Sequence, residues 1–221
     1  MAITRITSPA ITSVASTAIS GTLPAANIND TSIGNITALP AAVDVGSVIK
    51  LQTQTASSSS SITFTSTYIT TTYKKYYLDY TNVIISSDGG NIAATVSYDN
   101  GSNYVTSGYY YWRIFSHSNM TNNTLASGGG TNNSSLLMLG TGAGLGTSTD
   151  ESGSGRMIIF DPNSADSKFF LSQGMHINND GNLSQQLIYQ SLKTSSTINN
   201  IKITPNTGTM DGIFTLYGVT T

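Results

Sequence analysis

The chain has 221 residues, of which only 9% are charged, and its formal net charge is −2. A typical soluble domain has about 25% charged residues, so this surface must be solvated mainly by hydroxyl and amide groups. The low and nearly balanced charge gives no electrostatic basis for binding nucleic acid or an anionic membrane, and no stretch approaches the roughly 20 apolar residues that span a bilayer.

Cysteine is absent, so we expect stability to come from core packing and from subunit association instead of disulfides. The first residues, "MAITRITSPAITSVASTAISG", are repeatedly interrupted by Ser and Thr. A secretory signal has a continuous apolar segment. We therefore expect the protein to be made in a cytoplasm.

Residues 1–46 differ in composition from the rest of the chain. All Phe, Trp and Tyr residues lie between Phe64 and Tyr217, whereas the first segment alternates small apolar residues with hydroxyls and contains Pro9, Pro24 and Pro40. Prolines prevent helix formation and disfavour pairing in the middle of a sheet. We predict two parts: an extended N-terminal anchoring arm over 1–46, which becomes ordered against a partner, and a β body over 47–221.

The β body is predicted from short runs rich in β-branched and aromatic residues, each bounded by Gly, Asn, Asp or Ser. No segment shows sustained helical periodicity. This many short strands in one body predicts an all-β fold, an antiparallel β-sandwich of jelly-roll-like type. The predicted strands are 47–54, 61–70, 75–86, 91–98, 103–116, 134–140, 155–161, 168–177, 185–192, 199–204 and 212–219.

The segments between these runs predict local connections. "SSDGGN" (86–91) and "YDNGSN" (98–103) are expected to be hairpin links, because Asp-Gly and Asn-Gly accept the positive φ of tight turns. The Gly-rich segments 126–135 and 140–155 predict flexible loops, or else places where subunit backbones approach closely. The end of the chain, 198–219, predicts a closing strand pair whose inward residues are Ile201, Ile203, Phe214 and Leu216, with Tyr217 on the opposite face.

Residues that carry chemistry are few. "GTGAGLG" (140–146) lacks the spacing and the following helix of a dinucleotide loop. His117 and His176 are expected at strand ends or subunit contacts, and Glu151, the only Glu, lies in a Gly/Ser loop. The aspartates sit where turns would place them. We predict no catalytic, cofactor-binding or metal-binding residues, and therefore no enzyme activity and no cofactor.

The densest aromatic cluster is "GYYYWRIF" (108–115). In a strand, Tyr109, Tyr111 and Arg113 point to one side, and Tyr110, Trp112 and Ile114 to the other. One side is expected in the core, and the other in an intersubunit seam or, alternatively, a platform on which a sugar stacks. The predicted contact residues are Tyr109, Tyr111, Trp112 and Arg113.

Several stretches resemble the tail-fibre-like and minor virion proteins of tailed bacteriophages, of the marine and cyanobacterial type. They are the lead-in "GTLPAANINDTSIGNITALP", the opening "SSSSSITFTSTYITTTYKKYYLDYTNVI", the segment "SYDNGSNYVTSGYYYWR" and the closing "INNIKITPNTGTMDGIFTLYGV". The residues that carry the resemblance are Tyr76, Tyr77, Gly101, Asn103, Tyr104, Leu216, Tyr217 and Gly218.

This resemblance implies a non-enzymatic structural protein, usually a homotrimer, that is made in the host cytoplasm and assembled into the virion. We expect a short tail fibre or appendage, anchored through residues 1–46 to a tail or major capsid protein. The alternatives are a capsid decoration or cement protein and, from another class, a glycan-binding module or glycan hydrolase that contacts a host-surface glycan. We expect neither nucleic acid nor membrane as a partner.

Overall fold

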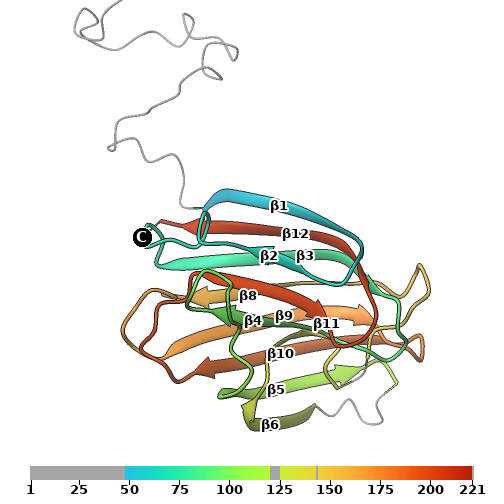
Figure 1. The fold of residues 1–221 in the computed structure, drawn as a ribbon. Coiled ribbons are helices and arrows are strands. Elements are labelled where there is room, and N and C mark those ends of the chain that lie inside the picture. The colour runs from blue at the N-terminus through green and yellow to red at the C-terminus, as the bar shows by residue number, and fades with distance from the viewer. Residues whose placement is uncertain (1–47, 120–124, 143, 221) are drawn as a thin grey trace, which may run out of the picture. The chain divides into compact units, whose positions relative to one another are not determined.

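The computed structural model describes residues 48–119, 125–142 and 144–220, and within them twelve strands and no α-helix (Figure 1). The predicted arm over 1–46 lies outside the described residues. The strands are β1 (Val48–Ser59), β2 (Ile62–Phe64), β3 (Lys75–Ile85), β4 (Ile92–Ser97), β5 (Tyr109–His117), β6 (Ala126–Asn133), β7 (Leu136–Leu139), β8 (Gly153–Phe160), β9 (Lys168–Ile177), β10 (Leu183–Leu192), β11 (Asn200–Pro205) and β12 (Met210–Val219).

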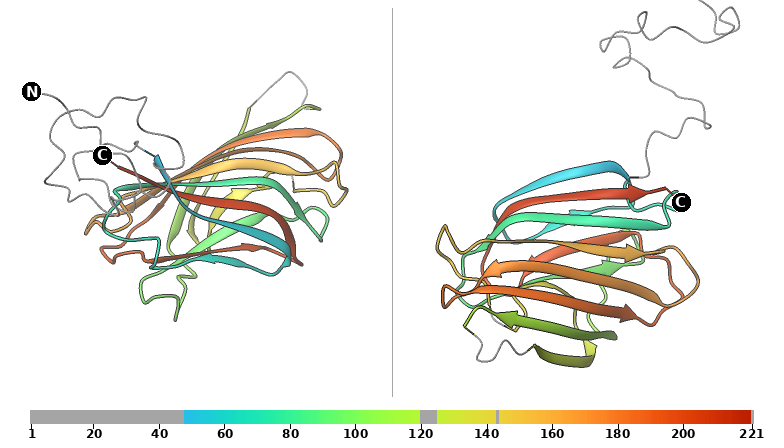
Figure 2. Two further views of the ribbon diagram at one scale, coloured as in Figure 1. Left: turned by 90° about the horizontal axis from the view of Figure 1, so that it is seen from above. Right: turned by 180° about the vertical axis from the view of Figure 1, so that it is seen from behind.

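These strands form two sheets that pack face to face. The larger has eight strands in the order β1, β12, β3, β8, β9, β10, β5, β6, and the smaller has four in the order β2, β11, β4, β7. All paired strands are antiparallel. The right view of Figure 2 shows the eight strands side by side. The predicted all-β antiparallel sandwich is therefore confirmed.

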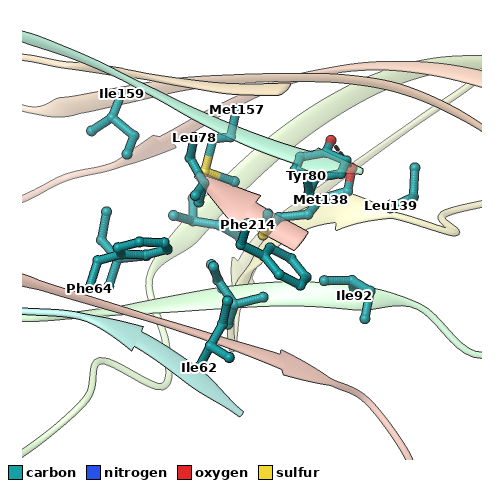
Figure 3. Packing of buried hydrophobic residues seen from close by; sticks show 14 of the residues in the cluster. Ile62, Phe64, Leu78, Tyr80, Ile92, Met138, Leu139, Met157, Ile159 and Phe214 are labelled. Carbon is teal, nitrogen blue, oxygen red and sulfur yellow. Dashed lines mark hydrogen bonds between the residues drawn. The ribbon is translucent and has the colours of Figure 1, made fainter. Parts of the chain in front are cut away.

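The core lies between the two sheets because alternate residues of each strand point inward. In β3 the inward residues Tyr76, Leu78 and Tyr80 are buried, while the intervening residues face out of the sandwich. Figure 3 shows Leu78 pointing from the larger sheet toward Phe64 of β2. Near them, the Tyr80 hydroxyl donates to the Met138 carbonyl of β7 (3.0 Å) and so ties the two layers together.

The chain passes repeatedly from one sheet to the other, and both predicted hairpin links are wrong for this reason. Segment 86–91 connects β3 of the larger sheet to β4 of the smaller, and segment 98–103 connects β4 back to β5. The positive φ values expected from the turn residues are present at Gly89, Asn100 and Gly101. Turn residues set the local backbone, whereas burial of nearly all of β4 places that strand between β11 and β7.

The closing segment, 198–219, also passes from one sheet to the other. β11 lies in the four-stranded sheet and β12 in the eight-stranded sheet, so the two strands face each other across the core and do not pair. The four residues predicted to point inward are fully buried, and Tyr217 is half-buried on the opposite side of β12. The predicted burial is confirmed, and the predicted pairing is wrong.

Three other predictions are corrected in extent. Only Ile62–Phe64 of the predicted strand 61–70 is a strand, because Tyr68 and Ile69 donate to the Thr65 carbonyl in a turn. The strand predicted over 103–116 begins at Tyr109. The predicted loop 126–135 is mostly β6, a Gly-rich strand at the edge of the larger sheet that pairs with β5.

Candidate functional site

The outer face of the eight-stranded sheet, the side turned away from the core, is the candidate site. Ten large apolar side chains of the described residues are between 38% and 63% exposed, and nine of them occupy outward positions of this sheet. The tenth, Leu125, directly precedes β6 and lines a hollow of the same face. The nine are Val48, Tyr110, Trp112, Phe160, Phe169, Met175, Leu183, Tyr189 and Ile213.

Aromatic rings gather where β5, β10 and β9 run side by side. Trp112 of β5 lies directly opposite Tyr189 of β10, their ring centroids are 5.9 Å apart, and Trp112 is 49% exposed. Tyr110 and Phe169 complete the wall of a hollow of about 510 Å³ beside this pair. We call it the ring hollow. Half-exposed rings of this kind offer apolar area together with a polar atom on Tyr and Trp.

A glycine of β6, Gly129, leaves the Trp112 ring uncovered by its own sheet. Gly129 lies opposite Trp112 on the outer face, where a Cβ would be 3.1 Å from the Tyr111 carbonyl and 3.5 Å from the Trp112 indole. Gly130 lies opposite Tyr111 on the other side of the sheet, where a Cβ would be 2.7 Å from the Tyr111 ring. The glycine run was predicted as a loop because glycine has no side chain with which to show strand alternation.

A second hollow, of about 770 Å³, lies next to the first on the same face, and we call it the paired-charge hollow. Arg156 of β8 bonds the Asp79 carboxylate of β3 through both Nε (2.5 Å) and Nη2 (2.8 Å). The guanidinium also lies 4.5 Å from the centre of the Tyr77 ring, and hydrogen bonding to Asp79 raises the pKa of Arg156. Gln173 and Met175 line the same hollow.

The four predicted contact residues divide between the two sides of β5. Tyr109 is 1% exposed and belongs to the core, where its hydroxyl accepts from the Val96 amide and donates to the Val105 carbonyl. Tyr111 and Arg113 point the same way as Tyr109 and are half-buried, with the guanidinium 5.8 Å from the Tyr111 ring. Only Trp112 lies on the outer face.

The remaining rings of the face escaped prediction because they come from other strands. Phe169 and Tyr189 are outward residues of β9 and β10, and only the order of strands in the sheet brings them beside Trp112. A signal was present in the sequence. "KFFLSQGM" and "QQLIYQSL" have apolar residues at outward as well as inward positions, which is unusual for a sheet with one solvated face.

No histidine of the described residues lines either hollow of the outer face. His117 Nδ1 and Ser184 Oγ are 2.9 Å apart, but Ser184 is only 2% exposed and lines neither hollow. Among the residues that the structure describes, Asp79 is the only carboxylate that lines the paired-charge hollow, and it is already bound to Arg156. The described part of the chain contains no group of three or more His, Cys, Asp and Glu residues that could hold a metal ion.

In the Gly-rich segment, Gly140, Gly144 and Leu145 pack backbone to backbone on the turn after β3. The Leu145 amide donates to the Gly90 carbonyl (2.8 Å), and the Gly89 amide donates to the Leu145 carbonyl (2.9 Å). A Cβ on Gly144 would overlap Gly89 backbone atoms, and one on Gly140 would lie 2.7 Å from the Gly90 carbonyl. Gly140 and Gly144 serve this close approach, and the Leu145 amide is not free to bind a phosphate.

Comparison of the chain with protein-family models, with curated proteins and with solved structures finds no match. No helix long and apolar enough to cross a bilayer occurs among the residues that the structure describes.

Proposed function

We propose that this chain is a non-enzymatic structural protein of a tailed-phage virion, a short tail fibre or similar appendage. In this proposal the β-sandwich contacts other macromolecules through the outer face of its eight-stranded sheet, and residues 1–46 anchor the protein to the particle. The observation that carries the proposal is the gathering of all ten exposed large apolar side chains of the described residues at this one face.

This gathering supports a contact function because single apolar residues scattered over a surface are ordinary, whereas adjoining ones, such as the four rings around the ring hollow, mark a binding surface. The hollows of the face have walls of rings, amides and one internally paired ion pair. This lining suits binding better than acid–base or nucleophilic chemistry, which requires positioned nucleophiles and bases. The assignment to a phage particle rests on the sequence resemblance.

The test is the location of the chain on the particle. Density for the β-sandwich in an electron-microscopy map of the virion is expected at the tail. Density over the capsid lattice would favour the alternative, a decoration protein, and its absence from purified particles would contradict a virion function altogether. Deleting residues 1–46 is expected to abolish attachment to the particle, and attachment that survives the deletion would overturn the anchoring role.

A further inference from the structure

We propose that a second copy of this chain packs face to face on the outer face of the eight-stranded sheet, with the ring hollow inside the contact. The inference deepens the proposed function, since it names the occupant of the contact surface, and its two-fold contact replaces the homotrimer that the sequence resemblance implies. Four properties of the face support a second copy: its apolar area, its types of residue, its charge and its relief.

The apolar area of the face matches that of one side of a stable interface. At roughly 150–200 Å² per large side chain, about half of it exposed, the ten residues together expose on the order of 800 Å². This sum covers the face from Val48 of β1 to Tyr110 and Trp112 of β5, and it equals the area of about 800 Å² that each partner contributes to a standard interface. Covering this face therefore needs a partner of protein size.

The types of residue on the face are those of an interface core. Trp, Tyr, Phe, Met and Arg are enriched at interfaces, whereas Lys, Asp and Glu are depleted there. The outer face carries all five of the enriched types, and the most exposed large apolar residues of its strands are Met175 (60%) and Phe169 (56%). A sugar platform uses rings flanked by polar groups. Exposed Met, Leu, Ile and Val side chains gain nothing from a sugar and gain much from burial against protein.

The charge of the face suits a surface that meets its own copy. The ion pair in the paired-charge hollow is internally neutral, because Asp79 holds Arg156 with two hydrogen bonds. Lys75 lies beside Phe160, 6.0 Å from the ring centre. The other outward lysine, Lys50, belongs to β1, and among the described residues no charged side chain lines the ring hollow. Two copies can therefore be apposed without bringing like charges together at the ring hollow, which would cost several kcal/mol.

The relief of the face, meaning its surface shape, combines protruding side chains with recesses. Phe169 stands at the wall of the ring hollow and Met175 at the wall of the paired-charge hollow. In a contact with two-fold symmetry each surface presents the same features to the other, so a protruding side chain can enter a recess of its partner. Side chains that fill such recesses carry most of the binding energy of an interface.

The experiment uses the full chain and its single tryptophan, Trp112. Sedimentation velocity over a dilution series is expected to show a species of twice the 23.2 kDa chain mass. The fluorescence of Trp112 is expected to shift to shorter wavelength as that species forms. The double variant Trp112→Ser/Phe169→Ser is expected to raise the dissociation constant by roughly 100-fold or more, since both residues would be hot spots.

The matched control is Tyr104→Ser, which removes a ring that stacks on Lys202 of the four-stranded sheet (4.0 Å). This variant is expected to associate like the parent. Far-UV circular dichroism and thermal melting check that every variant is folded. A dimer that persists in the double variant would overturn the proposal, because the contact would then lie elsewhere.

Because the chain contains no cysteine, single cysteines can be introduced for a crosslinking test. Ser191→Cys places one thiol beside the ring hollow, and Thr63→Cys places one on the four-stranded sheet. A flexible bis-maleimide is expected to link two copies of the first variant and not of the second. A parent chain that is a monomer or a trimer overturns the proposal, and a monomer whose Trp112 fluorescence responds to maltohexaose would assign the face to a sugar. None of these results depends on finding the chain on a virion.

Discussion

The side chain of Gln190 binds the backbone of Leu137 as a neighbouring strand would. Its Oε1 accepts from the Leu137 amide (2.6 Å), and its Nε2 donates to the Leu137 carbonyl (2.9 Å). Leu137 belongs to β7, an edge strand of the four-stranded sheet, and Gln190 reaches it from β10 of the other sheet. The backbone groups of Leu137 on the open edge of β7 are therefore hydrogen-bonded by a side chain. They are not available to pair with a strand of another chain.

Replacing Gln190 with Leu is expected to lower the free energy of unfolding by about 2 kcal/mol, because the amide and the carbonyl of Leu137, which are partly buried, would lose these bonds. Urea unfolding followed by circular dichroism measures the change. The control is Gln185→Leu on the exposed side of the same strand, where a change within about 0.5 kcal/mol is expected. Equal effects of the two substitutions would show that the bonds to Leu137 contribute little.

Because it contains buried tyrosines, the folded protein is expected to lose stability at high pH. Burial raises the pKa of Tyr80, Tyr109 and Tyr76 above the value of 10.0 that applies to the unfolded chain. Below pH 10 both states hold these protons and stability does not depend on them. Above pH 10 the unfolded chain releases protons that the folded protein retains, so stability falls by about 1.4 kcal/mol per pH unit for each fully shifted tyrosine.

Unfolding by urea at a series of pH values from neutral to strongly alkaline measures this slope. Tyr80→Phe removes one titrating group, so the variant is expected to lose stability less steeply than the parent. At neutral pH it is expected to be less stable by about 1 kcal/mol, because the bonds to the carbonyls of Met138 and Gln173 are lost. A parent slope that Tyr80→Phe leaves unchanged would contradict the assignment to Tyr80.

The Asp99 carboxylate is expected to stabilise the turn after β4 at neutral pH and to lose this effect in acid. Bonds from the Asn103 side chain and amide, and from the Ser97 hydroxyl, lower the pKa of the Asp99 carboxyl to about 2, from 3.8 in the unfolded chain. The stabilisation is therefore fully present above the unfolded value and is lost as the pH falls through about 2. Asp99→Ala is expected to lower the melting temperature at neutral pH.

The difference in melting temperature between Asp99→Ala and the parent is expected to shrink on acidification, because the parent carboxylate becomes protonated and loses its bonds. Asp180→Ala, an exposed acid in the turn before β10, serves as the control and is expected to melt close to the parent temperature. A difference that is the same in acid as at neutral pH would indicate that Asp99 acts through its shape and not through its charge.

Gly144→Ala tests the packing of the Gly-rich segment on the turn at Gly89. The new methyl group would overlap backbone atoms of Gly89, which cannot rotate away as a side chain can. We expect a loss of at least about 2 kcal/mol in the free energy of unfolding. Gly128→Ala is the control, because its Cβ would meet its nearest neighbour, Arg113, at 3.6 Å. Tolerance of Gly144→Ala would mean that the segment is loosely held.

Runs rich in aromatic and apolar residues were predictable as strands from the sequence. β9 has the predicted bounds, 168–177, and β3 differs from the prediction by one residue at its end. In β3 alternate apolar residues also mark the inward side, whereas β9 carries apolar residues on both sides. β6 was not predictable, because glycine carries no such mark. The sequence also did not indicate to which sheet a strand belongs, since β11 and β12 are similar in composition and lie in different sheets.

The candidate site was predictable only in part. Alternation correctly separated Trp112 from Tyr109, but it did not say which of the two faced the core, because both sides of β5 carry rings. Phe169 and Tyr189 reach the ring hollow through the order β9, β10, β5. That order is set by packing of the whole sandwich and is not encoded in any one strand.

The pairing of β1 with β12, and of β2 with β11, constrains how the protein can fold. The first two strands have partners that are synthesised almost last, so they must wait unpaired while the intervening residues emerge from the ribosome. Contacts this distant in sequence make folding slow. A chain interrupted before Met210 would release β1 without its partner and β3 with one side open, and such unpaired edges invite aggregation.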